Sequence, residues 1–438
     1  MGKVVKLEPT DQAKVAAKRR RAAKHAARGV GRTASIDRRR RRRRHKTALV
    51  LGGGGFTGGV YEIGALRALD LLAVNSSVNQ FDVYVGTSAG AFIAALCANG
   101  VTPEEMMRVV TRQGTPPFKD VDLGDLLRPN LLEFVRKGAA LPLRTLSLAR
   151  QLVTQRGGIS ALDLLLGFAE GLPSGAYTGA GIERYLHQVL SEPGRTDDFN
   201  ELACELYISA TDLDTCERVV FGVDEGESVP ISTAVRASGA LPMVYAPVRV
   251  NDRELIDGGM VSTTNLDIAV EAGAKLVVVI NPIVPFVNDF GERVRTLRGT
   301  RPRRVSDMGF PQIGYQAFKL VAHQRLHELA KTWESRYPGV DIVLIEPEPT
   351  DELMFQTSMM NFASRVEIAR HGFESVTKHL AEQYEHYQEV AERHEIEISG
   401  KRVRKVVEHF DAEPEQVSAW RKILEGTTGT LLRQSGSG

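Results

Sequence analysis

A serine between two glycines, at the join of an apolar run and a helical run, most constrains the fold of this 438-residue chain. The short apolar run from Val83 to Gly86 predicts a buried strand, and residues Ala89 to Ala98 predict a helix. The sequence at the join is GTSAG, with Ser88 in the middle. In such a nucleophile elbow the serine hydroxyl is exposed above the sheet, and the next helix directs its first N–H groups toward it.

The glycines of this turn have a steric role. A side chain at Gly86 or Gly90 would collide with the neighbouring strand and helix. Small residues also occur at tight turns that carry no chemistry. The strand before Ser88 and the helix after it favour the interpretation of Ser88 as a nucleophile.

A glycine-rich loop, GGGGFTGG, lies nearer the start of the chain. It directly follows a predicted strand at Thr47 to Leu51 and precedes a predicted helix at Val60 to Leu72. Consecutive glycines expose backbone N–H groups, and such groups bind anions. The loop therefore predicts an anion site at the end of a strand.

Two kinds of anion remain open for this loop. One is a nucleotide phosphate, because Gly53, Gly55 and Gly58 formally satisfy the pattern G-x-G-x-x-G. The other is the oxyanion of an acyl-transfer intermediate, which glycine-rich loops stabilise in lipases. No GxxxxGK[ST] pattern is present, so an ATP-type P-loop is excluded.

A serine nucleophile needs a base, and none of the ten histidines has the turn or strand-end context of one. His323 and His327 are spaced i, i+4 but form no HExxH, so we interpret them as structural or solvent-facing. Asp257 offers another base, since it ends a predicted strand and Gly258 and Gly259 follow it. A DGG sequence alone is more often a hairpin turn. Beside an elbow and a glycine-rich loop it becomes a candidate base.

Alternation of predicted strands and helices indicates an α/β fold. Further strands are predicted at 206–213, 218–222, 253–257, 275–282 and 341–347. Helices fill several of the gaps between them. We therefore expect a layered fold with a central sheet.

Charge divides the chain unevenly. Residues 1–46 carry a net charge of +15 and the remainder a net charge of −13. We expect 1–46 to be a disordered basic arm, whose partner would be an anionic membrane surface or another polyanion. No aromatic residue lies between its charges, so specific nucleic-acid recognition is not expected.

Two further segments depart from the α/β pattern. Residues 116–176 are rich in leucine and basic residues, which predicts a lid, a membrane-facing insertion or ordinary amphipathic helices over the core. Residues 376–438 are charged and predict a helical extension. The expected globular domain is therefore 47–375, flanked by an arm and an extension.

Cysteine content and hydropathy exclude several protein classes. The three cysteines form no CxxC pair, so neither a zinc site nor a disulfide framework is predicted, and we expect no metal and no cofactor. No run of 18 apolar residues is present, so no transmembrane helix is predicted. We expect a cytoplasmic protein that reaches the membrane only peripherally.

The glycine-rich loop, GTSAG and DGG, in this order and at this spacing, resemble the patatin-like phospholipase family. The resemblance covers about 47–375 and includes the stretches ATDLDTCERVVF and RASGALPMVYAPV. It implies an α/β layered sandwich with a mainly parallel central sheet flanked by helices. It also implies hydrolysis of lipid acyl esters, through an acyl-enzyme, by a serine–aspartate dyad.

The resemblance assigns roles to individual residues. Ser88 becomes the nucleophile and Asp257 its base. The implied oxyanion hole comprises Gly53, Gly54, Gly55, Phe56 and Ala89, and the glycines that support the motifs are Gly58, Gly86, Gly90, Gly258 and Gly259. Two departures affect the oxyanion site: Thr57 stands where the family often has Arg or Lys, and the loop is one residue longer, with Gly59 before Val60.

Three functions follow from these patterns. The first is a lipid acyl hydrolase of the phospholipase A or acylglycerol lipase type. The second is a non-catalytic membrane- or polyanion-binding protein with a vestigial patatin-like core. The third is a nucleotide-dependent enzyme, which would leave Ser88 and Asp257 unexplained.

Overall fold

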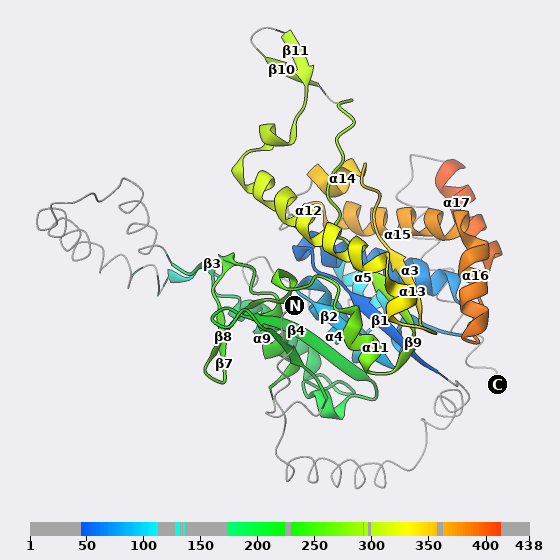
Figure 1. Cartoon of the computed structure of the whole chain (residues 1–438), viewed down its shortest axis with the longest axis horizontal. Coiled ribbons are helices and arrows are strands. Elements are labelled where there is room, and N and C mark those ends of the chain that lie inside the picture. The colour runs from blue at the N-terminus through cyan, green and yellow to red at the C-terminus, as the bar shows by residue number, and fades with distance from the viewer. Residues whose placement is uncertain are drawn as a thin grey trace, which may run out of the picture.

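A central sheet organises the part of the chain that the computed structural model describes, namely 45–112, 128–131, 133, 135, 173–223, 229–291, 293–296, 299–356 and 362–412. Its eight strands are β1 (Lys46–Leu51), β2 (Val83–Thr87), β4 (Glu205–Asp212), β5 (Arg218–Phe221), β7 (Val248–Val250), β8 (Arg253–Asp257), β9 (Ala274–Ile280) and β12 (Asp341–Ile345) (Figure 1).

The strand order is β12-β9-β1-β2-β4-β8-β7, with β5 also paired to β4. The five strands from β12 to β4 are parallel to one another, and β5, β7 and β8 are antiparallel to their neighbours. The carboxyl ends of β12, β9, β1 and β2 therefore meet at one edge of the sheet, where α/β folds place their sites. This arrangement confirms the expected α/β fold with a mainly parallel sheet.

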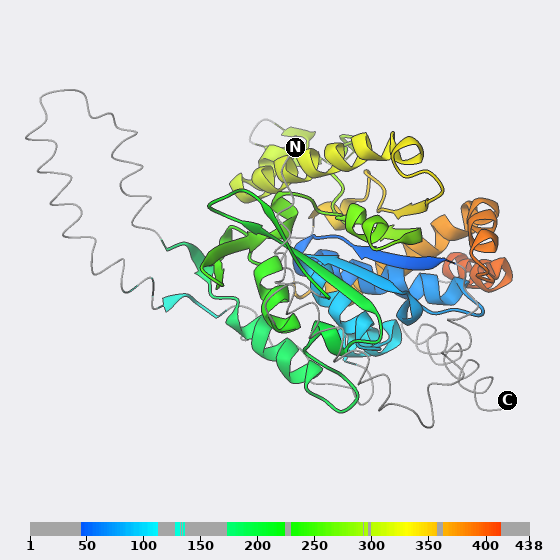
Figure 2. The ribbon, with the colours of Figure 1, turned by 60° about the horizontal axis from the view of Figure 1, so that its bottom comes forward.

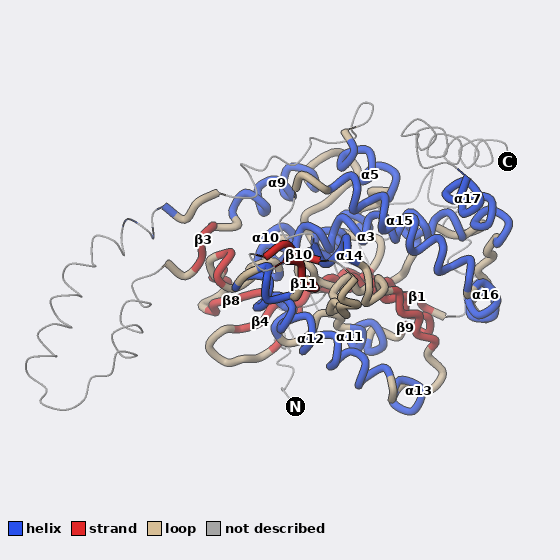
Figure 3. The backbone as a smooth tube through the Cα atoms, turned by 90° about the horizontal axis from the view of Figure 1, so that it is seen from above, coloured by secondary structure: helices blue, strands red, loops and turns tan. Residues whose placement is uncertain are grey.

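Helices cover both faces of the sheet, as Figure 3 shows from above. One side carries α3 (Gly55–Leu72), α4 (Ala89–Ala98), α5 (Pro103–Thr111), α9 (Ala180–Leu190), α10 (Ile231–Ser238) and α15 (Arg365–Glu382). The other carries α11 (Leu266–Glu271), α12 (Phe310–Ala330) and α13 (Trp333–Arg336). In Figure 2 the yellow α12 runs along the side of the sheet that also carries α11 and α13.

The smaller elements complete the described chain. They are the paired strands β3 (Gly175–Tyr177) and β6 (Met243–Tyr245), the hairpin of β10 (Arg293–Thr296) and β11 (Gly299–Pro302), the helices α14 (Glu352–Gln356), α16 (Tyr384–Arg393) and α17 (Gly400–Ala412), and the 3₁₀ helices η1 (Val78–Gln80), η2 (Phe199–Glu201), η3 (Gly258–Met260) and η4 (Val305–Met308).

Strand β1 shows why the sequence of the sheet is continuously apolar. Leu49 and Leu51 enter the hydrophobic core on the side of α3, whereas Ala48 and Val50 enter the core on the side of α11. Alternate side chains of a strand point to opposite faces, so a strand covered on both faces needs apolar residues throughout. This is the pattern on which the sequence prediction of buried strands rested.

Helix α3 crosses α15 at glycines. A Cβ added to Gly64 would overlap the backbone of Ala369, and one added to Gly372 would meet the carbonyl oxygen of Tyr61 at 2.6 Å. The two helices therefore pack with their backbones nearly in contact. The boundary expected between 375 and 376 lies inside α15.

Several expectations concern residues outside those that the structure describes. They include residues 1–44 of the basic arm, almost all of 116–172 in the predicted lid, and 413–438 at the end of the chain. Within the described residues, no helix is long and apolar enough to cross a membrane.

Candidate active site

Ser88 lies at the join of β2 and α4. Its backbone has φ 55° and ψ −123°, and a positive φ is uncommon for a residue with a side chain. A Cβ on Gly90 would overlap the backbone of Gly52, and one on Gly86 would overlap that of Ala91. The steric role expected for the two glycines is confirmed, and the strained turn is typical of a functional position.

Asp257 meets Ser88 from the end of β8. The Ser88 Oγ donates a hydrogen bond to Asp257 Oδ2 at 2.6 Å. The other carboxylate oxygen, Oδ1, accepts the N–H of Gly259 at 2.7 Å. A Cβ on Gly258 would overlap the backbone of Ser209 on β4. The two glycines after Asp257 thus turn the chain tightly against β4 and direct the carboxylate toward the hydroxyl.

Burial sets the proton affinity of the Asp257 carboxyl. The residue is 2% exposed. Loss of hydration raises its pKa to about 6, although the hydrogen bonds from Ser88 and Gly259 act in the opposite direction. The carboxyl is therefore mostly ionised at neutral pH but takes up a proton more readily than a surface aspartate. Its distance from the Ser88 hydroxyl and its pKa both suit a general base.

The loop after β1 brings backbone N–H groups to the same place. Gly54 and Gly55 have φ of 134° and 64°, values that glycine adopts without steric cost. A Cβ on Gly53 would lie 3.2 Å from the Ser88 Cβ, so this part of the loop faces the serine directly. Helix α3 begins at Gly55 and α4 at Ala89, and the first N–H groups of a helix have no intrahelical partner. Two helix amino ends, with their partial positive charge, therefore begin beside Ser88.

Comparison with known proteins identifies the family that carries this arrangement. A family model described as Patatin-like phospholipase matches residues 49–270, about half of the chain. The chain belongs to the patatin-like phospholipase family. The resemblance indicated by the glycine-rich loop, GTSAG and DGG is thereby confirmed.

Individual relatives of this patatin-like protein are distant. The Probable lipid hydrolase 463L of Invertebrate iridescent virus 6 is 22% identical over 223 residues, which are 50% of this chain and 61% of the viral protein. This chain therefore matches less than two thirds of the viral protein's length. The solved structures of VipD from Legionella pneumophila and of ExoU in complex with SpcU from Pseudomonas aeruginosa are 15% and 16% identical. Their TM-scores are 0.37 and 0.30, with coverage of 77% and 78% of this chain and of 67% and 53% of the other.

Helix α3 includes the second half of the glycine-rich loop. The sequence predicted a helix from Val60, whereas α3 begins at Gly55, so that prediction was wrong at its start. Glycine disfavours helices, but here packing outweighs propensity. A Cβ on Gly58 would meet the Gly53 oxygen at 3.0 Å, and one on Gly59 would lie 3.4 Å from the Ala89 Cβ. Glycine at position 58 therefore allows a tight contact with Gly53, whereas position 59 lies at ordinary contact distance from α4.

Ser238 holds the elbow and was missed by the sequence analysis. This fully buried residue ends α10, and its Oγ accepts the N–H of Ser88 at 2.8 Å. The hydrogen bond fixes the strained backbone of the nucleophile. Ser238 lies within RASGALPMVYAPV, a stretch that contributed to the family resemblance, but nothing in the sequence distinguished this serine from its neighbours.

A buried polar network lies beneath the elbow. The Asn265 side-chain amide donates to Thr87 Oγ1 at 2.9 Å and to Ser209 Oγ at 2.8 Å. Arg218 donates to Asn265 Oδ1 at 2.9 Å and binds the Asp267 carboxylate with two nitrogens. The network joins β2, β4, β5 and the start of α11. It thus fixes Thr87, the residue before Ser88, relative to β4, against which Gly258 packs.

An apolar cavity of about 180 Å³ adjoins Ser88 and Asp257. It contains all the residues expected in the dyad and the oxyanion hole: Ser88, Asp257, Gly53, Gly54, Gly55, Phe56 and Ala89. Helices supply most of its wall, including Val60 and Ile63 from α3, Ile93 and Leu96 from α4, Met106 from α5, and Tyr315 and Phe318 from α12. Of the supporting glycines only Gly259 lines it, while Gly58, Gly86, Gly90 and Gly258 lie behind it.

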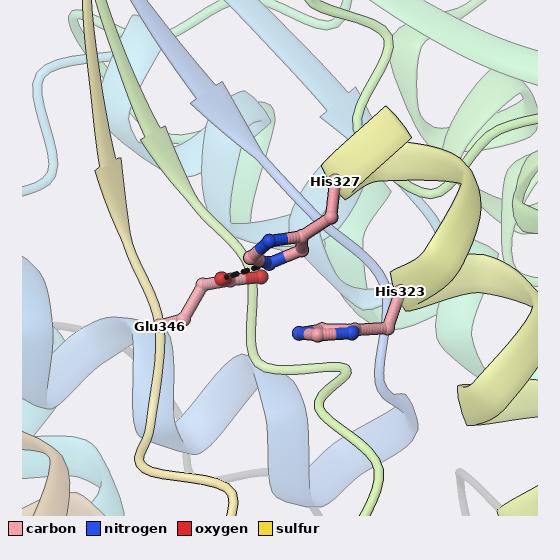
Figure 4. Close-up of side chains that lie close together, drawn as sticks. All are labelled: His323, His327 and Glu346. Atoms are coloured by element: carbon pink, nitrogen blue, oxygen red, sulfur yellow. Dashed lines mark hydrogen bonds and ion pairs between the residues drawn. The ribbon is translucent and has the colours of Figure 1, made fainter. Parts of the chain in front are cut away.

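One group among the described residues has the donors and the proximity for a metal ion. It consists of His323, His327 and Glu346, none of which lines the cavity (Figure 4). The sequence predicted no metal site here, because the two histidines form no HExxH pattern; Glu346 lies 19 positions beyond His327.

Proposed function

We propose that this patatin-like protein is a lipid acyl hydrolase that uses Ser88 as its nucleophile and Asp257 as its base. The observation that carries the proposal is the 2.6 Å hydrogen bond between Ser88 Oγ and Asp257 Oδ2 at an apolar cavity. Family membership and the lipid hydrolase among its relatives support a lipid ester as substrate.

The reaction proceeds in two steps through an acyl-enzyme. Asp257 accepts the proton of the Ser88 hydroxyl as Oγ bonds to the ester carbonyl carbon. The tetrahedral intermediate collapses, the alcohol departs with that proton, and the acyl group stays on Ser88. Asp257 next takes a proton from water, whose oxygen attacks the acyl carbon. Ser88 recovers the proton as the fatty acid leaves.

Backbone N–H groups stabilise the negative charge of both intermediates. We assign this role to the loop from Gly53 to Phe56 and to the N–H of Ala89. The helix amino ends at Gly55 and Ala89 add their partial positive charge. Because Gly53 faces Ser88, an oxyanion on the attacked carbon suits the loop better than a nucleotide phosphate.

The cavity walls favour a substrate with a hydrocarbon chain. Apart from Ser88 and Asp257, the lining consists mainly of glycine, aliphatic and aromatic residues. Burying an acyl chain there removes apolar surface from water, at about 0.8 kcal/mol for each CH₂ group. A phospholipid or acylglycerol ester therefore fits this site better than a short polar ester.

We further propose that the protein works on an anionic membrane surface. Residues 293–304 contain six arginines and no acidic residue, which adds a second basic segment to the arm at 1–46. The hairpin of β10 and β11 projects beyond α12 in Figure 1. Basic segments bind anionic lipid at about 1 kcal/mol for each Lys or Arg near the surface.

Helix α12, which follows this hairpin in the chain, carries exposed apolar side chains. Ile313, Leu320 and Val321 are exposed, whereas Tyr315 and Phe318 on the same helix line the cavity. The Asn288 amide donates to the carbonyl of residue 303 at 2.8 Å and so joins the hairpin to the segment after β9. A helix with one side in the cavity wall and the other exposed and apolar can bring the site to lipid.

A fluorophosphonate probe tests the nucleophile directly, because it reacts only with an activated serine. We expect labelling of the wild type and its loss in Ser88→Ala and Asp257→Asn. Ser191→Ala, an exposed serine on the carboxyl end of α9, should label as the wild type does. A folded wild type that stays unlabelled with and without anionic vesicles would support the non-catalytic binding protein instead.

Vesicle flotation separates attachment from catalysis. Replacing the seven arginines at 38–44 by glutamine, or Leu320 and Val321 by serine, should weaken binding to anionic vesicles. Both variants should still hydrolyse a water-soluble ester. Binding by the arginine variant should also lose its salt dependence. Wild-type flotation by both variants would contradict the membrane proposal.

A further inference from the structure

His323, His327 and Glu346 form a cluster of metal-ligating side chains at the carboxyl edge of the sheet, between α12 and the end of β12 (Figure 4). The two histidines are one turn apart on α12, and Glu346 directly follows β12. Their ligand atoms all lie within 4.8 Å of one another. His327 Nε2 and Glu346 Oε2 are 2.8 Å apart, and Figure 4 shows the three side chains converging.

Glu346 is held in place by a buried neighbour. Its second oxygen, Oε1, accepts a hydrogen bond from the Asn281 amide at 2.6 Å. Asn281 is fully buried and follows β9. Carboxylates that bind metal ions are commonly oriented by such outer hydrogen bonds. The cluster therefore has an oriented carboxylate in addition to its two imidazoles.

His323 has a ring position that an ordinary ion pair does not explain. Its ring lies 4.0 Å from that of His327, centroid to centroid. Within the residues that the structure describes, the His323 ring makes no hydrogen bond, so its nitrogens are available to a ligand. His327 and Glu346 alone would form a salt bridge, but His323 adds a third metal-ligating side chain to the group.

We propose that His323, His327 and Glu346 bind a zinc ion. Two histidines and one carboxylate are a recurrent zinc donor set, which leaves a fourth position for water. Zinc–ligand bonds of about 2.0–2.1 Å place tetrahedral ligand atoms roughly 3.3 Å apart. Ligand atoms that now lie up to 4.8 Å apart would have to move about 1–2 Å closer together to bind one zinc ion. His323 and His327 are partly exposed, so they can rotate.

The donor set selects the class of metal. Calcium and magnesium prefer sites made entirely of oxygen, whereas imidazole nitrogen suits zinc, cobalt, nickel and copper. Cobalt(II) adopts the same positions and absorbs visible light when bound by nitrogen and oxygen. It can therefore report on the site without any measurement of hydrolysis.

A bound zinc ion would fasten α12 to the edge of the sheet. His323 and His327 belong to α12, whereas Glu346 follows β12, which pairs with β9. The same helix carries Tyr315 and Phe318, which line the cavity. The metal would thus fix the position of one cavity wall, whether or not the dyad is catalytic.

Cobalt titration of the full-length, tag-free protein tests the site. We expect one equivalent of Co²⁺ to produce visible absorption, and Zn²⁺ to displace it. His323→Ala and Glu346→Gln should each weaken binding by at least the 10- to 100-fold that loss of an outer-shell partner typically costs. His187→Ala is the matched control, because it removes another surface histidine paired with a carboxylate, Asp197.

Thermal unfolding gives a second, independent measurement. Zinc should raise the melting temperature of the wild type and of His187→Ala, but not that of His323→Ala. His323→Ala is the informative variant, because it leaves the His327–Glu346 hydrogen bond intact. Absence of cobalt absorption in the wild type, or equal affinity in all the variants, would overturn the zinc site. Neither result would bear on the role of Ser88.

Discussion

Asp257 and Glu346 are two carboxylates at the same edge of the sheet with opposite surroundings. Asp257 is buried and accepts hydrogen bonds from a hydroxyl and a backbone N–H. The Glu346 side chain is 14% exposed and contacts a half-exposed imidazole. Loss of hydration raises the pKa of the first, which suits a proton acceptor, whereas the second is arranged as a metal ligand. The surroundings, and not the functional group, separate the two proposed roles.

Conversion of each carboxylate to its amide should show the largest difference. In Asp257→Asn the amide oxygen can still accept the N–H of Gly259, but the amide nitrogen can accept neither a hydrogen bond nor a proton from Ser88. We therefore expect kcat/KM for a soluble ester to fall about 10⁴-fold. Glu346→Gln leaves the dyad intact and should cause a far smaller loss, confined to the zinc-loaded protein. Steady-state kinetics on protein with wild-type circular dichroism measures both. Equal losses in the two variants would contradict the assigned roles.

Asp257→Asn should raise the stability of the folded protein although it lowers activity. The pKa of Asp257 is raised from 3.8 to about 6. Between these values the folded protein holds a proton that the unfolded chain has released, so the free energy of unfolding falls as pH rises. Asp257→Asn avoids this loss and should stabilise the protein by up to about 3 kcal/mol above pH 6.

Urea denaturation at two pH values measures this gain. The gain in the free energy of unfolding should be large at about pH 8 and vanish below about pH 3, where the carboxyl is protonated in both states. Glu346→Gln is the comparison variant, and its partly exposed site should give no such gain. Equal stability of wild type and Asp257→Asn at the higher pH would show that the buried carboxylate costs nothing.

The pH dependence of hydrolysis should report the same group. Asp257 must be ionised to accept a proton from Ser88, so kcat/KM should fall on the acid side with a midpoint near pH 6. Asp257→Asn should lose this limb from whatever activity remains. A soluble ester separates this titration from pH effects on vesicle binding. An acid limb that persists in Asp257→Asn would assign it to another group.

The fourth prediction concerns Ser238→Ala, for which we expect a smaller loss of activity than for Asp257→Asn. It removes the acceptor for the Ser88 N–H, and a lost hydrogen bond of about 1.5 kcal/mol lowers kcat roughly tenfold. Because Ser238 positions the nucleophile, kcat and the rate of fluorophosphonate labelling should fall together while KM changes little. Ser232→Ala on the same helix is the control, since its hydroxyl contacts Asp197. A change in KM alone would contradict the positioning role.

The sequence predicted the parts of the site that depend on local backbone geometry. Gly86 and Gly90 were expected to avoid clashes, and each would indeed place a Cβ against backbone. Short apolar runs predicted the strands because a sheet covered on both faces needs them. The spacing of the three motifs then placed Ser88 and Asp257 in one fold, and the structure brings their side chains together.

Contacts between segments far apart in the sequence were not predictable in this way. Ser238 lies 150 positions from Ser88, and the Asn265 amide reaches Thr87 across 178 positions. Serine and asparagine are common residues, so only the tertiary contact reveals their role. Glu346 is another example, because the histidine spacing in α12 gives no indication of a third ligand beyond the helix.

The crossing of α3 and α15 has a consequence for the order of events during synthesis. Gly64 leaves the ribosome roughly 300 residues before Ala369, the residue that its backbone contacts. Strands β9 and β12, which extend the sheet beside β1, also emerge late. Contacts this distant in the chain slow folding. The helix that follows the glycine-rich loop therefore gains its packing against α15 only after residue 369 has been synthesised.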